Sequence, residues 1–138
     1  MRILFLTNYY PPYEVGGYEQ LCRDVAVRLE ALGHTVAVLT SKHGLMRGEE
    51  TNEPGIYRLL HIQPQYNALL SPAMQFFLTR KQTEFHNRRI SRLVIEEFQP
   101  HVVFVWNLEG LPYELATDAE SRKDIAVAYW LAHYSPAQ

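Results

Sequence analysis

Hydrophobic and polar positions divide the amino-terminal part of the chain into two strand-like segments and one helix-like segment. Residues 3 to 8 and 36 to 39 are apolar without alternation, which is typical of strands buried on both faces of a parallel sheet. Between them, residues 18 to 32 place apolar side chains at helical spacing, with charged side chains on the opposite side. Gly33 follows and is expected to end this helix in the left-handed conformation. The pattern therefore predicts a β-α-β unit.

The middle of the chain continues the alternation of strands and helices. After a polar loop, residues 56 to 62 predict a third strand, which we expect near a sheet edge because Arg58 and His61 interrupt its apolar pattern. A long helix is predicted over residues 71 to 100, where Pro stands near both ends. At that length we expect a bend or break near residues 81 to 84.

The last third of the chain predicts another β-α-β unit. Residues 102 to 106 form the clearest buried strand, which ends on Asn107. Residues 111 to 120 predict a short helix, and residues 125 to 131 predict a strand that leads to His133. Strands that alternate with helices predict one α/β domain, a Rossmann-like doubly wound parallel sheet with helices on both faces.

Composition and charge exclude several classes of protein. The 138 residues are 47% hydrophobic and carry a net charge of -2, which excludes a disordered chain and the basic field of a nucleic-acid binder. The single cysteine, Cys22, cannot form an internal disulfide, and no Cys/His spacing suits zinc. No apolar run is long enough to span a bilayer, and the chain begins directly with a strand-like segment. We therefore expect a cytoplasmic domain without a nucleic-acid partner.

Ligands of an open parallel sheet bind outside the carboxyl ends of its strands, so the loops after the strands carry the candidate site. Gly16 and Gly17 stand directly before a predicted helix, where unpaired backbone N–H groups and the helix dipole favour an anion such as a diphosphate. The same two glycines would equally serve only to make the turn. The sequence contains neither G-x-G-x-x-G nor G-x-x-x-x-G-K-[ST] at this loop, which argues against a dehydrogenase or an ATPase.

Five segments carry a resemblance to a known family. They are the strand at residues 3 to 8, the Tyr-Pro-Pro step at residues 10 to 12, Gly16-Gly17-Tyr18-Glu19, the helix end at residues 29 to 34 and the strand at residues 36 to 40. Together they resemble the amino-terminal domain of retaining glycosyltransferases of family 4, which have the two-domain GT-B fold. The resemblance continues more weakly through residues 100 to 107 and 125 to 133.

The resemblance implies transfer of a sugar, hexosyltransferase-like, from a nucleotide sugar to a sugar or lipid-linked acceptor, without a metal or other cofactor. In that family the amino-terminal domain mainly holds the acceptor, and Gly16 and Gly17 would contact the donor diphosphate. A carboxy-terminal domain supplies the groups that grip the nucleotide. We expect residues 1 to 138 to be the acceptor-side half of such an enzyme, without that second domain, and to be inactive alone.

The resemblance also implies roles for single residues. His133 occupies the place where the family commonly carries His-Asp near the transferred sugar, although Tyr134 replaces the aspartate; the alternative is a partly buried histidine that closes a strand. Candidate acceptor-binding residues are Asn8, Tyr10, Glu19 and Asn107. Each has a structural alternative, which is packing the loop, complementing the helix dipole or capping a turn.

One part of the predicted long helix is strongly basic. Residues 80 to 92 carry a net charge of +4, so the rest of the chain carries -6. The residues concerned are Arg80, Lys81, Arg88, Arg89 and Arg92, against Glu84 alone, with Phe76, Phe77 and Phe85 beside them. This pattern is typical of a helix that lies on anionic lipid, so peripheral contact with the inner membrane face is one interpretation. A solvated helix face is the other.

A second function from a different class fits the same residues. The domain would then be a non-catalytic module that binds a nucleotide or anion, or a partner, and keeps the fold without catalysis. Binding of nucleoside diphosphates by the chain alone would distinguish this module from half of a split enzyme site.

Overall fold

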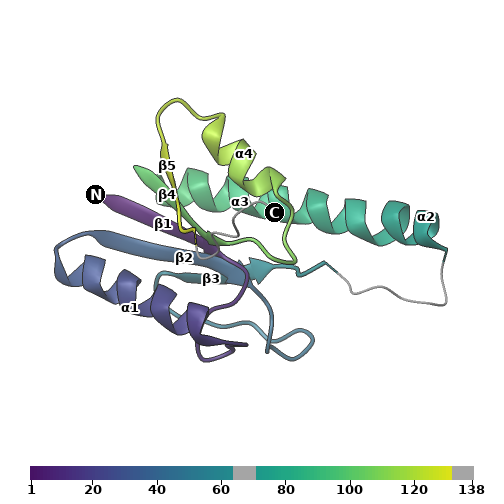
Figure 1. Cartoon of the computed structure of the whole chain (residues 1–138), viewed down its shortest axis with the longest axis horizontal. Coiled ribbons are helices and arrows are strands. Elements are labelled where there is room, and N and C mark those ends of the chain that lie inside the picture. The colour runs from purple at the N-terminus through teal and green to yellow at the C-terminus, as the bar shows by residue number, and fades with distance from the viewer. Residues whose placement is uncertain (64–70, 132–138) are drawn as a thin grey trace, which may run out of the picture.

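A five-stranded parallel sheet forms the centre of the molecule (Figure 1). The computed structural model describes residues 1–63 and 71–131. The strands are β1 (Arg2–Thr7), β2 (Thr35–Ser41), β3 (Ile56–Leu60), β4 (Val102–Asn107) and β5 (Ala126–Tyr129). Their order is β3-β2-β1-β4-β5, and every neighbouring pair is parallel. The prediction of a single Rossmann-like α/β domain is therefore confirmed.

Helices cover both faces of the sheet, as Figure 1 shows. Helix α1 (Gly17–Ala31) packs on one face, and α3 (Lys81–Phe98) and α4 (Glu114–Glu120) pack on the other. Two short helical segments, α2 (Pro72–Gln75) and the π-helix η1 (Phe76–Arg80), precede α3 without interruption. No helix in residues 1–63 and 71–131 has both the length and the apolar character needed to cross a membrane.

The apolar strands are buried from both sides, which explains their unbroken hydrophobic runs. In β1, Ile3 and Phe5 face α1, whereas Leu4 and Leu6 face α3 and α4; all four are at most 5% exposed. A fully buried side chain of this size contributes about 1.5 to 3 kcal/mol through removal from water. Each face of the sheet therefore carries its own hydrophobic core. The ends of the buried strands fix the positions of the loops described below.

Several predicted boundaries and the predicted bend are displaced by a few residues, for identifiable reasons. Strand β3 ends at Leu60 because the side chain of Asn87 on α3 binds the backbone of His61 in place of a strand neighbour, with Oδ1 accepting from its N–H at 2.8 Å and Nδ2 donating to its carbonyl at 2.7 Å. Helix α4 begins at Glu114, because a turn at Gly110, with a φ of 78°, comes first. The irregular stretch of the long helix is η1, one turn before the predicted bend.

Candidate functional site

The candidate site is a hollow at the carboxyl ends of β4 and β5. The chain leaves β1 toward α1 on one face of the sheet and leaves β4 toward α4 on the other, so this is the switch point where open parallel sheets bind ligands. The hollow has a volume of about 370 Å³. The residues that matter to its chemistry are Tyr18, Trp106, Asn107, Glu109, Tyr113 and Trp130.

Two stacked tryptophans form one wall of the hollow. The ring of Trp130 lies parallel to the ring of Trp106, with centroids 4.7 Å apart and an angle of 7° between the planes. Trp106 is 4% exposed, and its Nε1–H donates to the carbonyl of Tyr18 at 3.0 Å. Trp130 is 39% exposed. The buried ring therefore holds the outer ring as a flat platform, whose electron-rich face attracts C–H groups.

The polar groups of the hollow carry no positive charge. The side-chain oxygen of Asn107 accepts the backbone N–H of Glu109 at 2.9 Å, which leaves the Asn107 amide N–H₂ as a donor. The carboxylate of Glu109 is exposed and has no ion-pair partner among residues 1–63 and 71–131. No Lys or Arg of the described chain lines the hollow. This lining suits a neutral ligand rich in hydroxyl groups better than a phosphate.

Asn8 lies beneath the switch point and holds the loops together. It is 1% exposed, and its Nδ2 donates to the carbonyl of Glu109 at 3.0 Å while its Oδ1 accepts the N–H of Tyr9 at 2.8 Å. Its backbone N–H donates to the carbonyl of Asn107 at 2.9 Å. Both ends of the amide are therefore engaged within the protein, and Asn8 positions the loop after β4.

The two glycines before α1 differ in their surroundings. The N–H of Gly16 donates to Oε2 of Glu19 at 2.7 Å, so this carboxylate occupies the place of an external anion at that group. Glu19 is 5% exposed. A Cβ added to Gly17 would meet no atom within 4 Å, so a ligand can approach its backbone. Gly17 also precedes Tyr18, which lines the hollow.

The loop between β1 and α1 is held by a buried arginine that the sequence did not single out for this role. Arg58 is 4% exposed, and its guanidinium donates to the carbonyls of Tyr10 at 3.0 Å and Pro11 at 2.6 Å. It also forms an ion pair with Glu53, with Nε and Oε2 2.5 Å apart. The Tyr10 side chain lies in the core, where burial raises its pKa to about 12. Tyr10 therefore packs the loop and does not line the hollow.

Other candidate groups lie away from the hollow. Burial raises the pKa of the Cys22 thiol to about 12, so it stays protonated and is no nucleophile. No group of His, Cys, Asp and Glu suited to a metal ion occurs in the part of the chain that the structure describes. His133 and Tyr134 lie outside the described residues, so their predicted roles stay predictions.

The basic residues of the long helix are also separate from the hollow. Arg80, Lys81, Arg89 and Arg92 are exposed. Arg88 instead donates twice to the carboxylate of Asp118 on α4, at 2.7 and 2.8 Å, and these hydrogen bonds raise the pKa of its guanidinium.

Sequence reasoning found the edge of the sheet that carries the hollow but missed most of its lining. Asn107 is predicted because it follows the apolar run of residues 102 to 106, and in the structure it is the last residue of β4. Trp130 directly follows β5, but the predicted strand extends to residue 131, so the sequence predicts His133 as the residue beyond its end. Tyr18 follows the glycine pair, and Glu109 and Tyr113 lie in the loop after β4. Their positions after strands β1 and β4 are the one feature of the sequence that could have identified them as lining residues.

Comparisons with known proteins add no identity to this geometry. No family model, no curated protein and no solved structure gives a match to the chain. The hollow and its residues are therefore the basis for a function.

Proposed function

We propose that this domain is the acceptor-binding half of a retaining glycosyltransferase of the GT-B type. The observation that carries the proposal is the hollow at the switch point, which combines an aromatic wall with one amide and one carboxylate and contains no cation among the described residues. The parallel sheet of order β3-β2-β1-β4-β5 and the glycine pair before α1 support the same interpretation, since both agree with the resemblance to family 4.

The lining offers complementary contacts to a sugar. Trp130 presents a flat face to the C–H groups of a pyranose ring, and the exposed ring of Tyr113 extends this apolar surface. The carboxylate of Glu109 accepts hydrogen bonds from hydroxyl groups, and the amide of Asn107 donates one. A few convergent polar groups on an apolar wall are the usual composition of a small-molecule site.

The proposed reaction joins two substrates across this edge of the sheet. An acceptor hydroxyl oxygen forms a bond to the anomeric carbon of a nucleotide sugar, and the bond from that carbon to the diphosphate oxygen breaks. The acceptor proton leaves with the diphosphate or to solvent, and the anomeric configuration is kept. Gly17 at the start of α1 would stabilise the developing negative charge on the diphosphate through its backbone and the helix dipole.

The donor would be held mainly by groups other than those of the hollow. One backbone N–H of the glycine pair is already bound to Glu19, and Glu109 would repel a phosphate. We therefore infer that cationic groups supplied by a second domain grip the nucleotide, as the GT-B resemblance implies. His133 keeps its proposed place near the transferred sugar.

Calorimetry on the 138-residue chain tests this division of labour. With methyl α-D-glucopyranoside, methyl α-D-mannopyranoside and N-acetylglucosamine as probes, we expect at least one to bind with a roughly millimolar Kd. UDP and GDP should bind at least about tenfold more weakly. Trp130→Ala should abolish the sugar heat, whereas Leu32→Ala, which removes an exposed side chain at the far end of α1, should leave it unchanged.

A non-catalytic nucleotide-binding module is the second candidate. The exposed ring of Trp130 is the observation that favours this module, because an aromatic face stacks on a nucleobase as well as on a sugar. Micromolar binding of UDP or GDP by the chain alone, with no sugar binding, would establish the module and overturn the acceptor proposal. Robust turnover of a sugar nucleotide by the chain alone would overturn the division between two domains.

A further inference from the structure

The first turns of the long helix project from the body and contain no buried residue (Figure 1). They carry large apolar side chains that nothing in residues 1–63 and 71–131 covers. Met74, Phe76, Phe77 and Leu78 are 45 to 64% exposed. Monomeric proteins rarely leave such side chains together in water, so this end of the helix is expected to contact something else.

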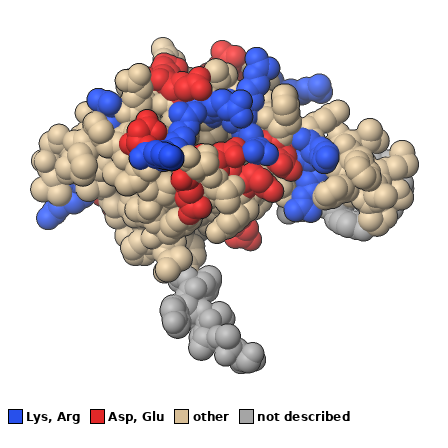
Figure 2. Space-filling model, turned by 90° about the horizontal axis from the view of Figure 1, so that it is seen from above, with Lys and Arg blue, Asp and Glu red and all other residues tan. Residues whose placement is uncertain are grey.

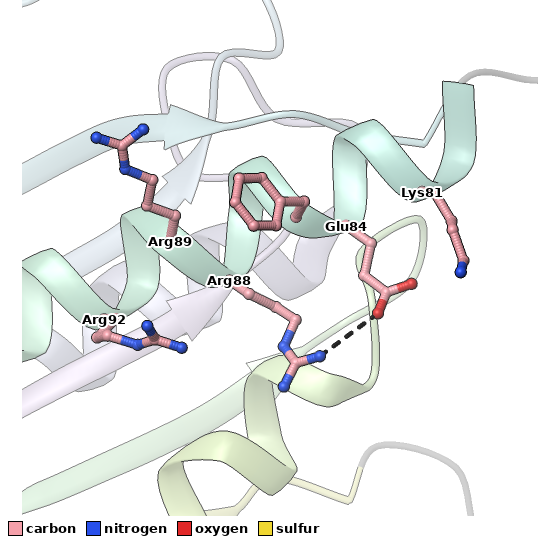
Figure 3. Close-up of a pocket in the computed structure, with 6 residues that line it drawn as sticks. Lys81, Glu84, Arg88, Arg89 and Arg92 are labelled. Carbon is pink, nitrogen blue, oxygen red and sulfur yellow. Dashed lines mark ion pairs between the residues drawn. The ribbon is translucent and has the colours of Figure 1, made fainter. Parts of the chain in front are cut away.

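Exposed cations follow directly along the same helix. Arg80, Lys81, Arg89 and Arg92 form no ion pair with any residue that the structure describes. With Phe85, which is 71% exposed, Lys81, Arg89 and Arg92 border an open hollow of about 620 Å³ on α3. In Figure 3, Arg88 turns toward Glu84, whereas Arg89 points to the opposite side of the helix.

Helical spacing puts five of these residues on one face. Met74, Phe77, Lys81, Phe85 and Arg89 follow each other at intervals of three or four residues. The buried residues of α3 lie on the opposite side, against the sheet: Asn87, Ser91, Val94 and Ile95. We call the exposed apolar and cationic side chains of this segment the basic-aromatic surface: Met74, Phe76, Phe77, Leu78, Arg80, Lys81, Phe85, Arg89 and Arg92. Figure 2 shows basic side chains at the base of the uncharged lobe that α2 forms.

Carboxylates that could neutralise the basic-aromatic surface are already occupied. Glu84 forms an ion pair with Arg88, with Oε1 and Nη1 3.6 Å apart, and Asp118 binds the same guanidinium in two places. Glu84 and Asp118 are therefore both paired with Arg88 and not with the other cations. The four remaining cations have no ion-pair partner among the described residues, although the chain as a whole is acidic.

We propose that the basic-aromatic surface binds the protein to an anionic phospholipid membrane. The apolar side chains of α2 and η1 enter the region below the headgroups, and the four cations contact the phosphates. A nucleic acid would match the cations, but it would leave Met74 and Leu78 without a role. A protein partner would have to supply several acids around an apolar groove. A lipid surface offers anionic headgroups and an apolar interior without any such specific geometry.

Membrane binding does not depend on the proposed function. It would orient the sheet relative to the membrane. The chain runs from β3 through α3 to the parallel strand β4, so α3 begins at the carboxyl edge of the sheet. The hollow lies at this same edge. Membrane contact through α2 therefore brings the ligand-binding edge near the lipid headgroups.

Vesicle co-sedimentation of the 138-residue chain tests the proposal. We expect binding to phosphatidylglycerol/phosphatidylcholine vesicles at low salt, at least about tenfold weaker binding to pure phosphatidylcholine, and loss of binding at high salt. Arg89→Glu with Arg92→Glu, and separately Phe77→Ser with Leu78→Ser, should each reduce binding about tenfold or more. Circular dichroism should show these variants to be folded, because no changed side chain is buried.

Matched variants on α1 control for charge and hydrophobicity in general. Arg28→Glu with Arg23→Glu removes the same charge from an exposed helix, and Val27→Ser with Leu32→Ser removes exposed apolar side chains. Binding should survive both. The proposal would be overturned by equal binding to neutral vesicles, by no sedimentation with either vesicle, or by equal losses of binding in the α1 variants. A dimer in sedimentation velocity that Phe77→Ser with Leu78→Ser abolishes would overturn it as well.

Discussion

Several polar residues at the carboxyl edge of the sheet are fully engaged in holding loops. Asn8 donates through Nδ2 to the carbonyl of Glu109 in the loop after β4 and accepts the N–H of Tyr9 through Oδ1, and Arg58 binds two carbonyls of the loop before α1. Buried polar groups with complete hydrogen bonding rigidify their surroundings. The side chains that remain accessible to a ligand at this edge include Glu109, Asn107 and Trp130, which line the hollow.

Thr40 and Thr7 form a matched pair for testing what buried hydroxyls contribute. Both are 0% exposed, but Thr40 Oγ1 has no hydrogen-bond partner in the described chain, whereas Thr7 Oγ1 donates to the carbonyl of Tyr9 at 3.3 Å. Thr40→Val should therefore raise the free energy of unfolding by about 1 kcal/mol, and Thr7→Val should lower it by about the same amount. Urea denaturation of both variants checks this, and equal losses would contradict it.

The ion pair between Glu53 and Arg58 predicts a dependence of stability on acid pH. Its hydrogen bonds from Arg58 hold the pKa of Glu53 below its ordinary value. The folded state thus binds protons less readily than the unfolded state, so the contribution of Glu53 is full above about pH 4.5 and is lost as the pH falls through the folded pKa. Glu53→Gln should lower stability at neutral pH and flatten its fall in acid.

Thermal unfolding between neutral and acid pH measures this effect. Glu50→Gln, in the same loop and exposed, serves as the control and should follow the unchanged protein at every pH. If the two variants behave alike, the ion pair does not contribute to stability. Arg58→Met should be more damaging than either, by about 3 to 5 kcal/mol, because it leaves a carboxylate and two carbonyls without their donor.

At the scale of elements, α1 begins and ends with glycines that serve different purposes. Gly33 ends the helix with a φ of 92°, a conformation that an alanine adopts only with strain. Gly17 at the start has no such φ, and a side chain there meets open space. The fold therefore requires a glycine at position 33 but not at position 17. This difference agrees with a role of Gly17 in ligand binding.

Substitution of the two glycines by alanine separates these reasons. Gly33→Ala should lower the free energy of unfolding by about 1 to 2 kcal/mol. Gly17→Ala should leave it unchanged or raise it by about 0.5 kcal/mol, because alanine favours the helix. Denaturation curves measure both. A loss at Gly17 as large as that at Gly33 would assign Gly17 to the fold alone.

Elements were predictable where burial decides them. The unbroken apolar runs of β1, β2 and β4 gave the strands, and Gly33 gave the end of α1. Boundaries set by tertiary contacts were not predictable, since the end of β3 depends on Asn87, which lies 26 residues away from His61. The basic residues were visible in the sequence, but only the contact with Asp118 separates Arg88 from the others.

At the scale of the whole molecule, the hollow lies at the carboxyl edge of the sheet, and the basic-aromatic surface begins near that edge and continues along α3. The hollow presents aromatic rings and a carboxylate, whereas the basic-aromatic surface presents cations and apolar side chains. The sequence predicted the edge because strand order and connectivity place ligands there. It could not predict the stacking of Trp106 on Trp130, which needs the register of β4 and β5 in space.

Tryptophan fluorescence tests the central claim most directly, because the two tryptophans of the chain both line the hollow. During titration with methyl α-D-glucopyranoside, methyl α-D-mannopyranoside or N-acetylglucosamine, at least one sugar should change the emission saturably, with a roughly millimolar midpoint. Tyr113→Ala, which keeps both tryptophans, should shift that midpoint upward about tenfold. Silent fluorescence with every sugar, or a midpoint that Tyr113→Ala leaves unchanged, would contradict an acceptor site in this hollow.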